Sequence, residues 1–85
     1  MTRRRYGRTN TGVILHWIAG KAARADNLWS DGESLFSYDL CIGRTIGGFK
    51  VVLNYTATGY AFVSMTTSHH VNLAARYADD VEDVE

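Results

Sequence analysis

Two adjacent glycines, Gly47 and Gly48, separate two segments in which apolar and polar residues alternate. Alternation with a period of two is typical of a strand that buries one face. Glycine readily adopts the positive φ angles that a two-residue hairpin turn requires, so this stretch predicts an antiparallel hairpin. Its register would place three apolar pairs opposite each other: Ile46 with Phe49, Ile42 with Leu53, and Leu40 with Tyr55.

A second turn is predicted at residues 57–59, where Gly59 suits the left-handed position of a three-residue loop. It would pair Tyr55 with Ala61, Leu53 with Val63 and Val51 with Met65. The resulting three-stranded antiparallel meander has one apolar face, made of Phe36, Tyr38, Leu40, Ile42, Val51, Leu53, Val63 and Met65. The opposite face would stay open.

Helical periodicity appears on both sides of this meander. Apolar residues recur at steps of three and four over residues 11–25 and again after Met65. Asn10 or Thr11 is expected to cap the first helix. Residues 26–34 are turn-formers and are expected to form a loop pinned by Leu28 and Trp29. The prediction is an α+β fold in the order helix, three-stranded antiparallel meander, helix, with both helices on the apolar face as a two-layer sandwich.

Eighty-five residues are enough for a single domain, and we expect one that spans residues 1–85. Residues 1–25 carry six basic side chains and no acidic one, whereas residues 79–85 carry five acidic side chains and no basic one. We expect a flexible basic arm at residues 1–9 and an acidic tail at residues 79–85. Cys41 is the only cysteine, so the fold has no internal disulfide.

The most suggestive polar cluster is TTSHHV, residues 66–71. Thr67 or Ser68 is the type of residue that caps a helix starting at His69 or His70. Adjacent histidines on a helix point about 100° apart, and the chain shows no recognised metal-ligand spacing. Spacing alone leaves open a Ser68 or Cys41 nucleophile with a histidine base. We expect no catalytic residue, no metal and no cofactor, and therefore not an enzyme.

Three segments carry a resemblance to a known group of proteins. They are Ser37-Tyr38, Asn54-Tyr55-Thr56, and Thr66-Thr67-Ser68 with His70. In these segments the chain resembles small uncharacterised proteins of tailed bacteriophages. The resemblance covers residues 34–72 and implies action in the cytoplasm of a host cell, but no catalytic role.

Two binding functions follow from these patterns. Aromatic residues on the open sheet face predict a surface for a host or phage protein, or for self-assembly as a homo-oligomer, formed by Lys50, Val52, Asn54, Tyr60 and Phe62. The alternative is nucleic-acid binding by the same aromatics and by an arm containing Arg3, Arg4, Arg5 and Arg8. The near-neutral pI of about 6.8 favours the first. No membrane association is expected, because the longest apolar stretch is far too short to span a bilayer.

Overall fold

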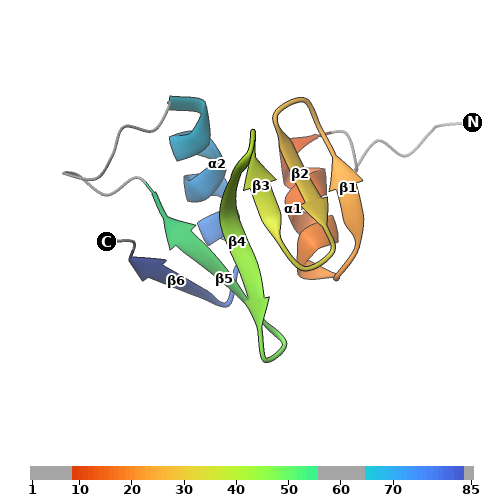
Figure 1. Ribbon diagram of the computed structural model, residues 1–85, viewed down its shortest axis with the longest axis vertical. Helices are drawn as coiled ribbons and strands as arrows, with labels where there is room; N and C mark the ends of the chain where they lie inside the picture. Colours follow the sequence, from red (N-terminus) through yellow and green to blue (C-terminus); the bar gives the residue numbers. More distant parts are fainter. Residues whose placement is uncertain (1–8, 56–64, 84–85) are drawn as a thin grey trace, which may run out of the picture.

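The computed structural model describes residues 9–55 and 65–83, which form two helices and one six-stranded sheet (Figure 1). Along the chain the elements are α1 Asn10–Ile18, β1 Ala22–Arg24, β2 Leu28–Asp31, β3 Leu35–Ser37, β4 Leu40–Ile46, β5 Phe49–Asn54, α2 Met65–Ala75 and β6 Asp80–Asp83. Across the sheet the strands keep this sequence order. Strands β1 to β5 are antiparallel to their neighbours, whereas β6 is parallel to β5.

The predicted order of helix, three-stranded meander and helix is wrong, and so is the two-layer sandwich built on it. The sheet of the described residues is mixed and has six strands, so the protein is a strand-rich α+β fold. Three strands arise from segments assigned to a helix, a loop and a tail, at residues 22–24, 28–31 and 80–83. Met65 begins α2 and Val51 pairs with Asp80 of β6, whereas the predicted turn at 57–59 lies outside the described residues.

Helix α1 is shorter than predicted and begins earlier. Thr9, not Asn10 or Thr11, is the N-cap, and its Oγ1 accepts a hydrogen bond from the Gly12 amide at 2.9 Å. The helix ends at Ile18, and Gly20 follows with φ +79°, a conformation that turns the chain out of the helix. Ala22, which extended the helical pattern, belongs to β1, because a small side chain fits either structure.

Strands β2 and β3 share a local pattern, Leu-Trp-Ser at 28–30 and Leu-Phe-Ser at 35–37. The leucine and serine of each triplet are buried, whereas the aromatic residue is only partly buried. Asp31 closes the turn between the strands, since its Oδ1 accepts hydrogen bonds from the amides of Ser34 and Glu33. These hydrogen bonds, that of Ser34 first, lower the pKa of the Asp31 carboxyl.

Phe36, Tyr38, Leu40 and Ile42 are predicted to share one face of a single strand, but this segment is a tight hairpin of β3 and β4. Ser37 pairs with Leu40 around a turn at residues 38–39. The register then shifts, so that Leu35 pairs with Gly43 and Ile42 becomes the extra residue of a β-bulge. The hairpin at Gly47 and Gly48 is confirmed: both have positive φ, and Ile46 pairs with Phe49.

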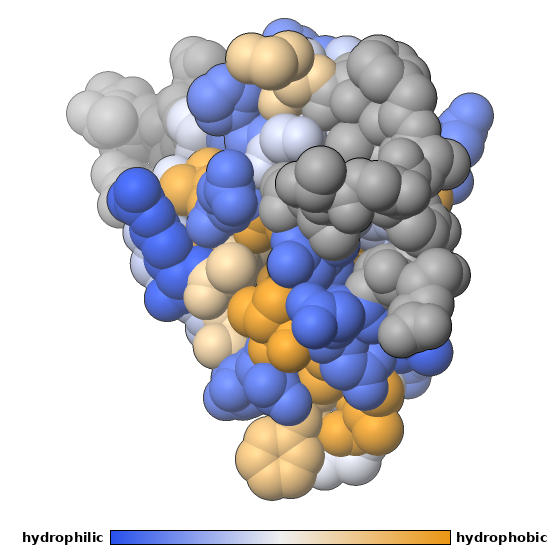
Figure 2. All heavy atoms as spheres, turned by 90° about the vertical axis from the view of Figure 1, so that its left-hand side faces the viewer, coloured by the Kyte–Doolittle hydropathy of each residue, from blue (hydrophilic) through white to orange (hydrophobic). Residues whose placement is uncertain are grey.

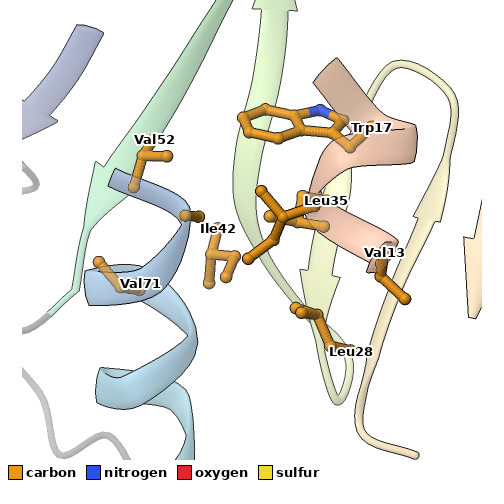
Figure 3. Packing of buried hydrophobic residues seen from close by; sticks show 9 residues of the cluster. Val13, Trp17, Leu28, Leu35, Ile42, Val52 and Val71 are labelled. Carbon is orange, nitrogen blue, oxygen red and sulfur yellow. The ribbon is translucent and has the colours of Figure 1, made fainter. Parts of the chain in front are cut away.

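Both helices contribute to one core on the sheet (Figure 3). Gly43 is buried because the Trp17 ring crosses its Cα so closely that an added Cβ would lie 2.8 Å from the ring. The Trp17 Nε1 donates a hydrogen bond to the Glu33 carbonyl at 2.9 Å. The members of the core cluster are Val13, Ile14, Trp17, Leu28, Leu35, Ile42, Val52, Val71 and Ala74.

Candidate functional site

An aromatic surface lies on the sheet opposite the core. Trp29 and Phe36 alternate with the buried residues of β2 and β3, so their rings point away from the helices. The two residues are cross-strand partners and their rings stack, with centroids 4.1 Å apart and planes 11° apart. We call Trp29, Phe36 and the adjacent Tyr38 the aromatic face.

Tyr38 holds an unusual backbone conformation within the aromatic face. Its φ is 56°, the only positive φ of a non-glycine residue in the described chain, and its side chain is 46% exposed. The turn is fixed from two sides, because the Trp29 Nε1 donates to the Tyr38 carbonyl at 2.9 Å and the Tyr38 amide donates to the Asn27 carbonyl at 2.7 Å. Such strain is often kept at functional sites, and here it presents a tyrosine to solvent.

The neighbours of Trp29 determine what its ring can bind. Arg24 of β1 is its cross-strand partner on one side, and the guanidinium lies 5.6 Å from the ring centroid. Phe36 of β3 stacks on the other side. Both faces of the Trp29 ring are therefore occupied, and the ring presents an edge to a partner.

A polar site is buried between α2 and β3. Ser37 Oγ lies 2.7 Å from His70 Nδ1 and 3.0 Å from Thr67 Oγ1, so the three side chains form a hydrogen-bonded network. All three are buried, Ser37 completely. The network joins two of the segments that carry the phage-protein resemblance, although they are 30 residues apart in the sequence.

This network resembles a serine-histidine pair in composition but not in accessibility. A nucleophilic hydroxyl must reach a substrate, and the Ser37 side chain has no exposed surface. Burial is the main cause that lowers the pKa of His70, and the neighbouring His69 lowers it further. The arrangement therefore holds a neutral histidine inside the protein and connects α2 to the sheet.

The predicted partner-binding residues are not collected on one open face. Val52 belongs to the core and Lys50 is only 7% exposed, so for these two the expectation of an uncovered surface is wrong. The β-bulge at Ile42 is the reason, because one extra residue exchanges the two faces of the strand pairs that follow it. Asn54 is partly buried at the end of β5, while Tyr60 and Phe62 lie outside the described residues.

Lys50 instead makes contacts within the fold. Its Nζ donates hydrogen bonds to the Thr45 Oγ1 at 2.7 Å and to the Gly32 carbonyl at 3.1 Å. It also lies 5.5 Å from the centroid of the Trp17 ring. The buried ammonium thus connects the β4–β5 hairpin to the turn between β2 and β3.

The other predicted functional positions have mixed outcomes. Thr67 and Ser68 are not helix caps, because α2 already begins at Met65. His69 is exposed and His70 buried, as expected for adjacent residues pointing apart on a helix. The basic side chains of the predicted arm, Arg3, Arg4, Arg5 and Arg8, lie outside the described residues, and most of the predicted acidic tail forms β6.

A polar hollow of about 220 Å³ lies between the start of α1 and one side of α2. Its lining is Asn10, His69, Asn72, Leu73 and Arg76. Within residues 9–55 and 65–83, the Arg76 side chain has no acidic partner, and the first turn of α1 contains no acidic residue. The hollow therefore combines a cation with the positive end of a helix dipole.

The aromatic face could have been found from the sequence. The repeated triplets Leu-Trp-Ser and Leu-Phe-Ser flank Asp31-Gly32, which is a turn dipeptide, and together they indicate a hairpin with both aromatics on one side. The pairing of Ser37 with His70 gave no such signal, since it depends on the tertiary fold.

Comparisons with protein families, curated proteins and solved structures gave no match. In the described part of the chain, no three side chains of His, Cys, Asp or Glu are grouped to hold a metal ion. Neither described helix is long and apolar enough to cross a membrane. The function is therefore inferred from the aromatic face, the buried network of Ser37 and His70, and the hollow between α1 and α2.

Proposed function

We infer that the protein is a small non-enzymatic binding protein whose partner is another protein, bound through the aromatic face. The observation that carries this proposal is the strained Tyr38 beside the stacked pair of Trp29 and Phe36, on the side of the sheet opposite the core. Aromatic side chains supply much of the binding energy at protein interfaces. Under the resemblance to phage proteins, the partner is a host or phage protein met in the host cytoplasm.

The geometry of Trp29 favours a protein over a nucleic acid at this face. Proteins that bind single-stranded nucleic acids stack the bases on open aromatic rings. Arg24 and Phe36 already occupy the two faces of Trp29, so a base would have to displace one of them. An exposed tyrosine and the edges of two rings are suited to apolar and hydrogen-bonding contacts with a folded partner.

The test compares partner capture by three forms of the full chain. Wild type, Tyr38→Ser and Tyr77→Ser would each be used as bait in lysate from infected bacteria, with bound proteins identified by mass spectrometry. Tyr77 is the matched control, because it is a tyrosine of similar exposure, 42%, that follows α2 and does not belong to the aromatic face. A specific partner should be lost with Tyr38→Ser and kept with Tyr77→Ser; equal capture by all three would contradict the proposal.

Nucleic-acid binding is the second candidate, and the hollow between α1 and α2 favours it. The arginine-rich segment of residues 3–8 ends directly before Thr9, so it is attached at the edge of a hollow that contains Arg76. Phosphate groups are bound by such combinations of arginine side chains and helix N-termini. This site is separate from the aromatic face, so the two candidates can be tested independently.

A gel-shift assay at low and high salt would test the second candidate. Binding should weaken with salt and should be reduced both by Arg76→Ala and by joint replacement of Arg3, Arg4, Arg5 and Arg8 with alanine. Arg44→Ala is the matched control, because Arg44 is exposed on β4 and does not line the hollow. Absence of a shift, or a shift that these variants leave unchanged, would exclude it.

A further inference from the structure

We propose that copies of the protein assemble head to tail, by pairing the acidic edge strand β6 of one copy with the basic edge strand β1 of the next. The ligand of each edge is thus a second copy of this chain. The proposal uses none of Trp29, Phe36 and Tyr38, so it does not depend on the proposed function.

The described sheet ends in two open edges. β1 and β6 are its first and last strands, on opposite sides of the molecule (Figure 1). An edge strand carries unpaired backbone donors and acceptors that can pair with another chain. In β1, the hydrogen bond from the Ala25 amide to the Leu28 carbonyl sets the alternation, which directs the backbone groups of Ala22 and Arg24 outward.

Neither edge is closed by its own side chains. Ala22 and Ala23 are small and leave the backbone of β1 accessible, and Ala22 and Arg24 are exposed. All four residues of β6 are exposed. Figure 2 faces the β6 side of the molecule, where hydrophilic side chains lie beside apolar ones. Proline, a common means of blocking an edge strand, is absent from the sequence.

Charge decides which edges can meet. β1 contains Arg24 and directly follows Lys21, whereas β6 contains Asp80, Glu82 and Asp83. Two β6 edges would place acid against acid, and two β1 edges base against base, so both symmetric contacts are disfavoured. Only the unlike pair brings opposite charges together.

Strand direction is compatible with this pairing. Four antiparallel steps lead from β1 to β5, and β6 is parallel to β5, so β6 runs in the same direction as β1. A copy displaced along the sheet would therefore place its β1 parallel to β6, repeating the pairing that β6 already makes with β5. Such a contact does not close on itself after two copies, and it leads to chains or rings.

A hollow at the start of β1 is suited to a side chain of β6. It measures about 370 Å³ and is lined by Leu15, His16, Ala19 and Lys21, which combine apolar surface with a basic side chain. On β6, Val81 stands between Asp80 and Glu82 and is 42% exposed. Val81 pairs with the core residue Val52, so its side chain lies on the helix side of the sheet, where a hollow beside α1 of the next copy would accept it. Asp80 and Glu82 point to the opposite side of the sheet, as Arg24 does.

The test reverses the charge of each edge separately. Variant A carries Asp80→Lys and Glu82→Lys, and variant B carries Lys21→Glu and Arg24→Glu. Molar mass would be measured by light scattering over a range of concentrations at low salt, with circular dichroism to verify folding. Wild type should exceed the monomer mass of 9.5 kDa as concentration rises, and high salt should reverse this.

The mixing experiment distinguishes specific pairing from a change in net charge. A alone and B alone should remain monomers, whereas an equimolar mixture should recover a mass of at least a dimer, because each edge of A then meets an oppositely charged edge of B. Glu33→Lys with Asp39→Lys is the matched control and should assemble as wild type does. Wild type that stays monomeric at all concentrations, or folded A and B that fail to assemble when mixed, would overturn the proposal. Tyr38→Ser should assemble normally, which separates this result from failure of the proposed function.

Discussion

Tyr38 combines a costly backbone conformation with an exposed ring. A left-handed conformation costs an ordinary residue roughly 1–2 kcal/mol, whereas glycine adopts it freely. A fold selected only for stability would therefore favour glycine at φ 56°. The tyrosine is explained if its side chain is needed by a partner, which places stability and binding in opposition at one residue.

Replacing Tyr38 with glycine should separate these two properties. Because glycine also adds about 0.5–1 kcal/mol of backbone entropy to the unfolded chain, the free energy of unfolding should stay equal or rise by up to about 1 kcal/mol. Partner binding should fall. Urea denaturation gives the first quantity and the capture assay the second. A clear loss of stability would show that the ring supports the fold instead of a partner.

At the scale of elements, β4 shows where sequence reasoning succeeds and where it stops. The hairpin at Gly47 and Gly48 was predictable, because both the turn chemistry and the alternation are local. The β-bulge at Ile42 was not predictable, because residues 36–43 alternate as they would in a regular strand. Gly43 contacts Trp17 on the core side of the sheet. In a regular strand it would point to the opposite side from Ile42, away from Trp17. One extra residue then moved Val52 and Lys50 to the buried side.

The close contact between Gly43 and Trp17 gives a stability prediction for this element. In Gly43→Ala the new Cβ would lie 2.8 Å from Trp17 Cζ2 and 3.1 Å from the Leu35 Cβ. Overpacking of a core typically costs about 1–3 kcal/mol, so the free energy of unfolding should fall by about that amount in urea denaturation.

A double-mutant cycle provides the control for Gly43→Ala. Trp17→Phe removes the ring atoms that the new methyl group meets, so the double variant should lose less stability than the two single variants together. Additive losses would show that the contact with Trp17 is not the cause.

At the scale of the whole molecule, the sequence indicated an α+β fold with the correct number of described helices, but not its sheet. Residues 22–24 and 80–83 are strands because they pair with neighbours, although local pattern favoured a helix and a free tail. The same holds for the buried network, in which Ser37 meets His70 only after α2 packs on the sheet. Pairings between distant segments leave little trace in a single sequence.

We expect that network to make the stability of the whole fold dependent on pH. Burial lowers the pKa of His70 below its usual value of 6.5, so near and below this pH the unfolded chain binds a proton more readily than the folded one. The stabilising contribution of a neutral His70 is therefore complete above pH 6.5 and is lost as the pH falls through the lower folded-state pKa. Each unit of difference between the two pKa values corresponds to about 1.4 kcal/mol.

Urea denaturation of wild type, His70→Gln and His69→Gln between about pH 7.5 and pH 5 would measure this effect. Wild type should lose stability toward acid. His70→Gln should be less stable at neutral pH, because glutamine cannot reproduce the 2.7 Å bond to Ser37, but its stability should depend less on pH. His69→Gln should keep most of the dependence of stability on pH, since His69 is exposed and is only the smaller cause that lowers the pKa of His70. If His70→Gln keeps the full slope, other groups cause the acid sensitivity, and the buried network does not control it.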